Sequence, residues 1–385
     1  MSARNEERGR GRPLRADVVI AGAGIVGLAH AIEAVRRGLS AVVVERDIRA
    51  GGASVRNFGH VFASAQAGEA LEAALETRER WSELAREAGF WLLQSGSLVV
   101  ARAEDELAVM EEFAAQSDDK ARVLSRAEVL ERAPIGEAGV VGGLLAPGDC
   151  RLDPREAVPA LARWLAEDMG VTFAWGSTVL AVEPGLVHTS GGDIAAEAVV
   201  LATGHDLDRL FPGLAEEAGL RRCTLHMLRV TPPGRPAIEP ALLTGLSLLR
   251  YRGFAECPSL PILRARIERE RPDLVEAGVN LMLTQRPDGD LVIGDTHHYA
   301  RTPSPFKDER LDELLLGEVA ALLGAEDLEV RERWRGVYAD VPDRDFLVAS
   351  PASGVRAVAV TSGIGMTTAL GLAPRVLEDL LPVPA

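Results

Sequence analysis

Residues 16–27 read Ala16-Asp-Val-Val-Ile-Ala-Gly22-Ala-Gly24-Ile-Val-Gly27. The opening part is a short β-branched run, which predicts a buried strand, and an alanine-rich helix is expected over residues 28–37. A second strand is expected over residues 40–45. A strand, a helix and a strand within about 30 residues predict a parallel sheet and hence an α/β fold.

The glycine spacing of this stretch is that of a dinucleotide-binding loop. Gly22 permits the tight turn after the strand, Gly24 lets a pyrophosphate approach the backbone, and Gly27 lets the helix pack closely against the strand. Glu45 ends the second strand about 20 residues further on, where an acidic side chain accepts hydrogen bonds from ribose hydroxyls. The loop predicts a bound dinucleotide but does not by itself separate FAD from NAD.

Three later segments favour FAD. The glycine-rich stretch 51–59 follows the second strand and offers the Ser54 hydroxyl to a phosphate. Residues 199–204 form an apolar strand that runs into a glycine, where the chain passes the nucleotide again. Residues 361–371 repeat the order strand, glycine-rich turn and helix. The positive end of that last helix would stabilise the negative charge of a reduced flavin.

The rest of the chain predicts a second domain inserted into the first. Helices are expected over residues 69–88, 103–116 and 153–168, with a final helix up to residue 381. Strands are expected over residues 96–102, 171–175, 198–203 and 355–361, and a hairpin over 280–293. The segment 232–261 is expected to be irregular. The expected division is a disordered tail over residues 1–15, a nucleotide-binding domain over 16–80, 150–215 and 336–385, and a substrate domain over 81–149 and 216–335.

Composition restricts the function classes. The net charge of −15 makes the chain a poor candidate for nucleic-acid binding, which needs a basic surface. No stretch approaches the roughly 18 apolar residues of a membrane-spanning helix, and residues 1–15 lack the apolar core of a secretory signal, so a cytoplasmic protein is expected. Cys150, Cys223 and Cys257 are widely spaced, which predicts buried free thiols, with no zinc or other metal site.

These segments occur in the order seen in the glycine/D-amino-acid oxidase (DAO) family, which the chain resembles over essentially its whole length after residue 15. The resemblance is carried by the glycine loop, Glu45-Arg46, Gly-Ala-Ser with Asn57 and Gly59, Ala202-Thr203-Gly204 and the final Gly-x-Gly helix. It implies an α/β fold with a Rossmann-like FAD-binding domain of the glutathione-reductase type. It also implies an inserted α+β substrate domain built on an antiparallel sheet.

Segments 54–59, 244–251 and 293–299 further resemble a branch of this family proposed to act in aminophosphonate breakdown. The resemblance implies that a small anionic amine, an aminophosphonate or an amino acid, loses hydride from its α-carbon to flavin N5. Water then hydrolyses the resulting imine. The alternative enzyme is a D-amino-acid, glycine or sarcosine oxidase or dehydrogenase, and the alternative without catalysis is an NAD- or FAD-binding regulatory protein.

The residues expected to contact FAD lie in or near the segments named above. They are Gly22, Gly24, Ile25, Val26, Gly27, Glu45, Arg46, Ala53, Ser54, Asn57, Gly59, Val179, Ala202, Thr203, Gly204, Gly363, Gly365, Met366 and Thr367.

The substrate pocket is expected to take histidines and arginines that follow these segments. The candidates are His60, His297, His298, Arg250, Arg335 and Tyr338, with Arg56 as a further guanidinium. A histidine could hold the amine or take its proton, and a guanidinium binds a phosphonate or carboxylate through paired hydrogen bonds. Adjacent residues of an extended segment point to opposite faces, so at most one of His297 and His298 is expected to enter the site. Asp295 is expected to cap a turn.

The lysines bear on the electron acceptor. The sarcosine-oxidase side of the family uses a lysine near the flavin to help oxygen react. The only lysines, Lys120 and Lys307, lie in polar stretches that are expected to be exposed. The sequence therefore gives no support for fast reaction with O2, and O2 or another acceptor both stay open. A monomer and a homo-oligomer are equally compatible with the sequence.

Overall fold

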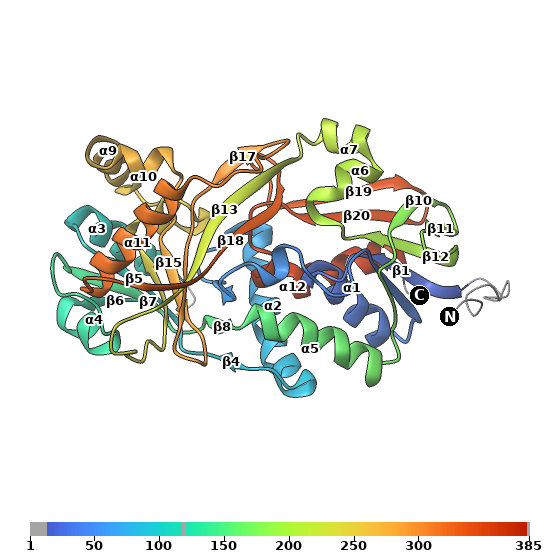
Figure 1. The fold of residues 1–385 in the computed structure, drawn as a ribbon, viewed down its shortest axis with the longest axis horizontal. Coiled ribbons are helices and arrows are strands. Elements are labelled where there is room, and N and C mark those ends of the chain that lie inside the picture. The colour runs from blue at the N-terminus through green and yellow to red at the C-terminus, as the bar shows by residue number, and fades with distance from the viewer. Residues whose placement is uncertain (1–13, 118–120, 383–385) are drawn as a thin grey trace, which may run out of the picture.

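The computed structural model describes residues 14–117 and 121–382, and it folds them around two large sheets (Figure 1). The expected tail over residues 1–15 lies outside the described residues except for Leu14 and Arg15. These two already belong to the first strand, because they pair with residues 194 and 195 of a neighbouring strand.

The first sheet is parallel at its centre, as the opening strand, helix and strand predict. Its strands are β1 (Leu14–Ala21), β2 (Ala41–Glu45), β9 (Thr172–Trp175), β10 (Val179–Glu183), β11 (Leu186–Thr189), β12 (Ile194–Leu201), β19 (Phe346–Ala352) and β20 (Val355–Val360). β12, β1, β2 and β9 lie side by side in parallel, and β20 runs parallel to β12. β10, β11 and β19 add antiparallel pairs at the margins.

Helices cover both faces of this sheet. One face carries α1 (Ile25–Arg36), α2 (Gly68–Ala88), α5 (Pro154–Glu167) and α12 (Gly365–Leu380), and the other carries α6 (Leu207–Leu210) and α7 (Pro212–Glu217) (Figure 1). Val18, Val19 and Ile20 of β1 are fully buried, which explains why the central strand is a continuous apolar run. α5 begins at Pro154 because the Asp153 side chain accepts a hydrogen bond from a backbone N–H of the first turn.

The second sheet is mainly antiparallel. Its strands are β5 (Ser97–Ala101), β6 (Arg122–Ser125), β7 (Gly142–Ala146), β13 (Arg221–Thr231), β14 (Ala241–Thr244), β15 (Met282–Gln285), β16 (Leu291–Gly294), β17 (His298–Ala300) and β18 (Glu329–Asp340). Only β14 and β5 pair in parallel among the described strands of this sheet. The long strands β13 and β18 run from this half of the molecule towards the first sheet (Figure 1).

Further helices and a small sheet complete the fold. The helices are α3 (Glu104–Gln116), α4 (Arg126–Arg132), α8 (Gly245–Leu248), α9 (Leu260–Glu270), α10 (Pro272–Glu276) and α11 (Glu309–Leu323). The small sheet contains β3 (His60–Val61), β8 (Cys150–Leu152) and β4 (Leu92–Leu93). Among the described residues, no helix is both long and apolar enough to cross a lipid bilayer.

Most expected elements are confirmed, with one clear error. The hairpin over 280–293 forms as β15 and β16, and the three cysteines are free and buried. The irregular segment expected over 232–261 instead contains β14 and α8, because the apolar residues 241–243 are buried and pair with β5 and β15. The expected domain limits at residues 80, 215 and 335 fall inside α2, α7 and β18. The domain division otherwise stays a prediction.

The contact between α12 and α2 gives a test of this packing. A Cβ atom added at Gly371 would lie 2.2 Å from the backbone oxygen of Ala73, so Gly371→Ala should destabilise the protein by about 1–3 kcal/mol. The matched control is Gly317→Ala in α11, where a Cβ meets nothing within 4 Å and should stabilise by about 0.5–1 kcal/mol. Denaturant unfolding of both variants measures the difference, and equal effects would contradict the packing.

Candidate FAD and substrate site

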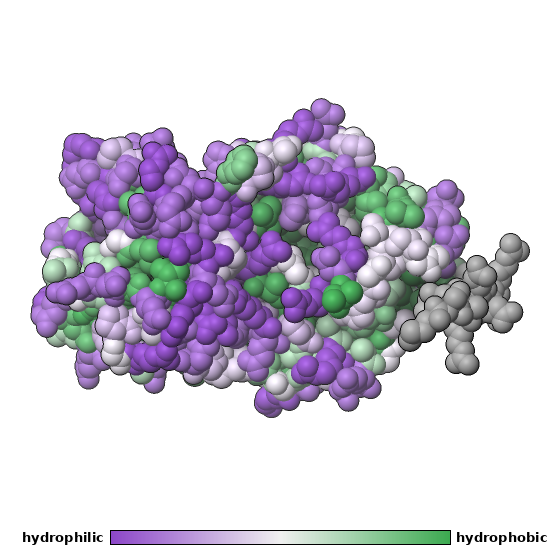
Figure 2. All heavy atoms as spheres, viewed as in Figure 1, coloured by the Kyte–Doolittle hydropathy of each residue, from purple (hydrophilic) through white to green (hydrophobic). Residues whose placement is uncertain are grey.

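A cavity of about 500 Å³ extends from the glycine loop between β1 and α1 to the second sheet. Its walls come from that loop, from residues 50–58, 202–206 and 362–367, and from parts of β15 and β18. Figure 2 shows that the face of the molecule seen there is mainly hydrophilic, with hydrophobic residues in small separate patches. The cavity is thus lined by segments that lie far apart in the sequence.

Two segments predicted separately from the sequence meet at the start of α1. The backbone N–H of Ile25 donates to Ser54 Oγ at 2.8 Å, and the N–H of Ala23 donates to Glu45 Oε2 at 2.8 Å. A Cβ atom at Gly24 would lie 3.0 Å from Ser54 Oγ. The glycine loop, the end of β2 and the 51–59 stretch thus form one surface at the positive end of a helix, where an anion is favoured.

Two of the expected FAD contacts have a packing role and do not line the cavity. A Cβ atom at Gly27 would lie 1.9 Å from the carbonyl oxygen of Gly22, so only glycine lets α1 pack this closely on β1. Gly59 has a φ of +76°, and a Cβ there would lie 1.9 Å from the carbonyl oxygen of Leu152. Both residues shape the cavity wall from behind it.

The other expected FAD contacts all line the cavity. They are Gly22, Gly24, Ile25, Val26, Glu45, Arg46, Ala53, Ser54, Asn57, Val179, Ala202, Thr203, Gly204, Gly363, Gly365, Met366 and Thr367. Asn57 also holds its own loop, because its Nδ2 donates to the carbonyls of Ala53 and Ser54 and its Oδ1 accepts from Gly59. Their contacts with FAD stay a prediction.

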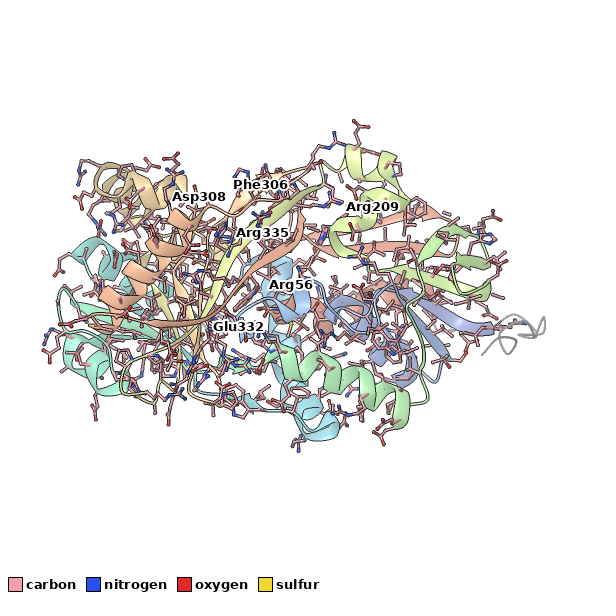
Figure 3. The ribbon with its side chains drawn as sticks, in the orientation of Figure 1. Arg56, Arg209, Phe306, Asp308, Glu332 and Arg335 are labelled. Atoms are coloured by element: carbon pink, nitrogen blue, oxygen red, sulfur yellow. The ribbon has the colours of Figure 1, made fainter. Side chains whose placement is uncertain are left out.

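The structure separates the substrate candidates into two groups. Those that line the cavity are His60, His297, Arg250, Tyr338 and Arg56. His298 is exposed at the start of β17 and does not line it. Arg335 does not line it either, because its guanidinium donates to the carbonyl oxygens of Ser304 and Phe306. Figure 3 shows Arg335 next to Phe306, and Arg56 between the two halves of the molecule. At most one of His297 and His298 was expected to enter the site, and His297 is the one that lines the cavity. Arg335 lies outside the cavity wall, and the catalytic roles of the remaining candidates stay predictions.

Arg250 brings a positive charge into the cavity without a carboxylate partner. Its Nη2 donates to the carbonyl oxygen of Ser362 at 2.8 Å and to the hydroxyl of Tyr338 at 3.2 Å. No ion pair within the described chain includes it. Because a half-buried charge held only by neutral oxygens is poorly compensated, the cavity offers Arg250 to an anionic ligand.

His60 and His297, the two candidate histidines that line the cavity, are neutral. The Nδ1 atom of His297 lies 2.9 Å from the carbonyl oxygen of Gly278 and donates to it, which leaves Nε2 with its lone pair. Burial, assisted by the charge of Arg250, lowers the pKa of His297 to about 3. Burial and the nearby charge of Arg151 lower the pKa of His60 to about 3, and both ring nitrogens of His60 lack a hydrogen-bond partner among the described residues.

Sequence reasoning missed several polar wall residues. They are Asp206, Tyr251, Asn280 and Asp295. Tyr251 and Asp295 lie within the segments 244–251 and 293–299 that carried the closer resemblance, so the signal was present but not assigned to them. Asp295 was expected only to cap a turn. In the structure its side chain is buried in the cavity wall, and its Oδ1 has no hydrogen-bond partner among the described residues.

The cavity has the features that bound FAD requires. The N-termini of α1 and α12 both contribute to its wall, so backbone N–H groups are available for the pyrophosphate and for the polar edge of a flavin. Gly22 and Gly24 at the start of α1, and Gly363 and Gly365 at the start of α12, line the wall without side chains and leave room for a ligand. The unpartnered nitrogens of His60 are a further sign that the wall is completed by a ligand.

Comparison with known sequences agrees with this geometry. Residues 17–378 match the protein family described as "DAO: FAD dependent oxidoreductase". The chain belongs to this family. The match confirms the expected family, the expected fold class and FAD as the cofactor, and it sets aside the regulatory-protein alternative.

Individual relatives agree at the level of the fold. The bifunctional protein ThiO/ThiG of Trichormus variabilis is 28% identical over 351 residues, which cover 85% of this chain and 46% of the relative, so the chain spans about half the length of that curated relative. The crystal structure of L-proline dehydrogenase from P. horikoshii is 20% identical with a TM-score of 0.79, covering 96% of this chain and 94% of the other. Glycine oxidase from Geobacillus kaustophilus is 21% identical with a TM-score of 0.76, covering 95% and 94%.

Lys307 is exposed, as expected from the sequence, and its Nζ also lies 3.0 Å from Oδ2 of the fully buried Asp312. It does not line the cavity, and Lys120 lies outside the described residues. Within the described part of this DAO-family chain, no lysine contributes to the cavity wall.

The glycine loop gives a direct test of the FAD site. Gly24→Val would place a branched side chain against Ser54 and into the pyrophosphate position, so the purified variant should lose at least about nine-tenths of its bound FAD. Flavin absorbance per protein measures the loss. Gly213→Val, at an exposed glycine of α7 where a Cβ meets nothing within 4 Å, is the control and should stay fully loaded. A fully loaded Gly24→Val would contradict the placement.

Proposed function

We propose that this chain oxidises the carbon–nitrogen bond of a small anionic amine, and that the preferred anion is a phosphonate. The observation that carries the proposal is the guanidinium of Arg250, which faces the cavity and, among the described residues, is hydrogen-bonded to Ser362 and Tyr338 and to no carboxylate. An enzyme gains a fixed point that orients the substrate against the cofactor.

The choice of phosphonate over carboxylate rests on charge and on the segments that resemble the aminophosphonate branch. A phosphonate carries up to two negative charges where a carboxylate carries one. Arg56 also lines the cavity, and no ion pair within the described chain includes it. Arg46 and Arg209 also line the cavity, but both pair with Asp206. Two guanidiniums without an ion-pair partner among the described residues suit the more highly charged anion, because arginine binds such groups through paired hydrogen bonds.

The amino group is oriented at the other side of the same space. His297 Nε2 offers a lone pair there, since Nδ1 is committed to Gly278. A neutral imidazole can accept a hydrogen bond from the amine and fix its direction. Bound FAD supplies the acceptor for hydride from the carbon next to nitrogen, and the imine that remains is hydrolysed to a carbonyl compound and ammonia. The rings of Phe62 and Tyr251 pack edge to face with their centroids 5.0 Å apart. They form an apolar part of the cavity wall, which limits the access of water.

Anaerobic reduction of the FAD-loaded protein tests the reaction and its substrate class. Aminoethylphosphonate, β-alanine and propylamine share an amine on a short chain and differ in the second group. The proposal expects flavin bleaching by aminoethylphosphonate first, slower bleaching by β-alanine, and very little by propylamine. Bleaching by D-amino acids, glycine or sarcosine alone would favour the amino-acid oxidase alternative. Return of the flavin bands on admission of air would identify O2 as an acceptor.

Arg250 gives the sharpest mutational test of the anion site. Arg250→Met should raise KM for aminoethylphosphonate at least about tenfold and leave KM for propylamine within about threefold, because only the anion loses a charged partner. Arg335→Met is the matched control, since Arg335 is held outside the cavity by Ser304 and Phe306, and its KM values should stay within about twofold of the parent. Equal losses in the two variants would contradict the assignment of Arg250.

A further inference from the structure

The proposed substrate must lose a proton before it can be oxidised. A small amine is an ammonium ion at neutral pH, and hydride leaves the neighbouring carbon only when nitrogen has a free lone pair. His297 is a poor acceptor for that proton, because burial and the charge of Arg250 lower its pKa to about 3. A different group in the cavity has to face the ammonium.

Asp295 has the position for this role. It follows β16 directly, and its backbone N–H and carbonyl are both hydrogen-bonded to the backbone of Asn280, at 3.1 and 2.9 Å. The residue is 4% exposed and lines the cavity, while its Oδ1 is buried without a hydrogen-bond partner among the described residues. An unsatisfied buried carboxyl oxygen is costly, so the geometry is that of a wall group completed by a ligand.

We propose that Asp295 is the ammonium-binding and proton-accepting residue of this site, and that with Arg250 it selects substrates carrying both an anionic group and an amine. This inference rests on the proposed function. It assigns the cavity a pair of opposite charges for the two ends of one zwitterionic ligand. A plain anion gains no contact at Asp295, and a plain amine leaves Arg250 without a charged partner, so a ligand with both groups binds in preference to either.

The surroundings of Asp295 explain how the proton moves. Arg250 lowers the pKa of Asp295, but burial outweighs it and raises that pKa to about 8. The other titratable groups that face it are neutral: His297, Tyr251, whose pKa burial raises to about 12, and Cys223, whose pKa burial also raises to about 12. Before substrate binds, Asp295 is therefore protonated at neutral pH.

The proton balance follows from these states. When the ammonium ion binds, Asp295 releases its proton to solvent and becomes the carboxylate partner of the cation. The carboxylate then takes one proton from the ammonium, which leaves a neutral amine beside a protonated Asp295. One proton is released overall for each substrate bound below about pH 8. After oxidation, hydrolysis of the imine frees the cavity with Asp295 in its original state.

The role of Asp295 can be tested without turnover, by measuring equilibrium binding of ligands to the FAD-loaded enzyme after its flavin has been reduced with dithionite. Aminoethylphosphonate and ethylphosphonate differ only in the amine, so the ratio of their dissociation constants isolates the ammonium contact. The parent enzyme should favour the amino ligand at least about tenfold at pH 8. Calorimetry in buffers of different ionisation enthalpy should show proton release with the amino ligand only. The preference for the amino ligand should increase as the pH rises towards about 8, because a larger fraction of Asp295 is then already deprotonated before the ligand binds.

Asp295→Asn should lose that preference and the proton release while it binds ethylphosphonate within about threefold of the parent. The matched control is Asp149→Asn, a fully buried carboxyl outside the cavity whose pKa burial raises to about 7 and whose Oδ1 accepts from Ser64. It should keep both properties. Retained flavin absorbance shows that the Asp295→Asn variant is folded. If that variant does not fold, Asp295→Ser is used in its place.

Two results would overturn the inference while leaving the proposed function standing. One is an unchanged preference in Asp295→Asn. The other is an equal loss of both ligands, which would make Asp295 a hydrogen-bond donor to the anion. Failure of the parent enzyme to bind either phosphonate would instead overturn the proposed function, and the inference with it.

Discussion

The close backbone contact between β1 and α1 determines how the other parts of the cofactor site are positioned. Gly27 packs directly on the carbonyl of Gly22, and no larger residue fits there. This contact directs the first turn of α1 at Ser54 and sets the end of β2, with Glu45, against the same loop. A comparable contact lets α12 pack against α2 through Gly371, so that the second helix N-terminus also reaches the cavity. The cofactor site is thus built from backbone approach more than from side-chain chemistry.

The other half of the cavity depends on charge. Arg250 contributes a cation bonded only to neutral oxygens, while Asp295 and His297 contribute groups that burial keeps neutral. The proposed anionic amine would complete this arrangement, because its anion would compensate the guanidinium and its ammonium would ionise Asp295. The proposed preference for zwitterions would then follow from desolvation, since each unpaired charge in the cavity is costly. Orientation of the amine against the cofactor follows from the same two contacts.

How much of the fold and of the site could be predicted from the sequence depends on whether the residues follow local sequence rules. The FAD half was predictable because its residues follow local rules: a β-branched strand, glycines at fixed spacing and an acidic strand end. The substrate half was predictable only in part. His298 and Arg335 were placed by sequence proximity, but β17 exposes the first and the carbonyls of Ser304 and Phe306 hold the second. β18 is rich in charged residues and pairs with β13, where Glu332 forms an ion pair with Arg229. Its sequence therefore lacks the apolar pattern from which a strand can be predicted.

A crystal structure of the reduced, FAD-loaded protein with aminoethylphosphonate is the most direct test of the account. The account predicts phosphonate oxygens within hydrogen-bond distance of the Arg250 guanidinium. It also predicts the substrate nitrogen within hydrogen-bond distance of the Asp295 carboxyl, with the carbon bonded to that nitrogen facing the flavin. A phosphonate bound by Arg335, or a ligand whose nitrogen points away from Asp295, would contradict it.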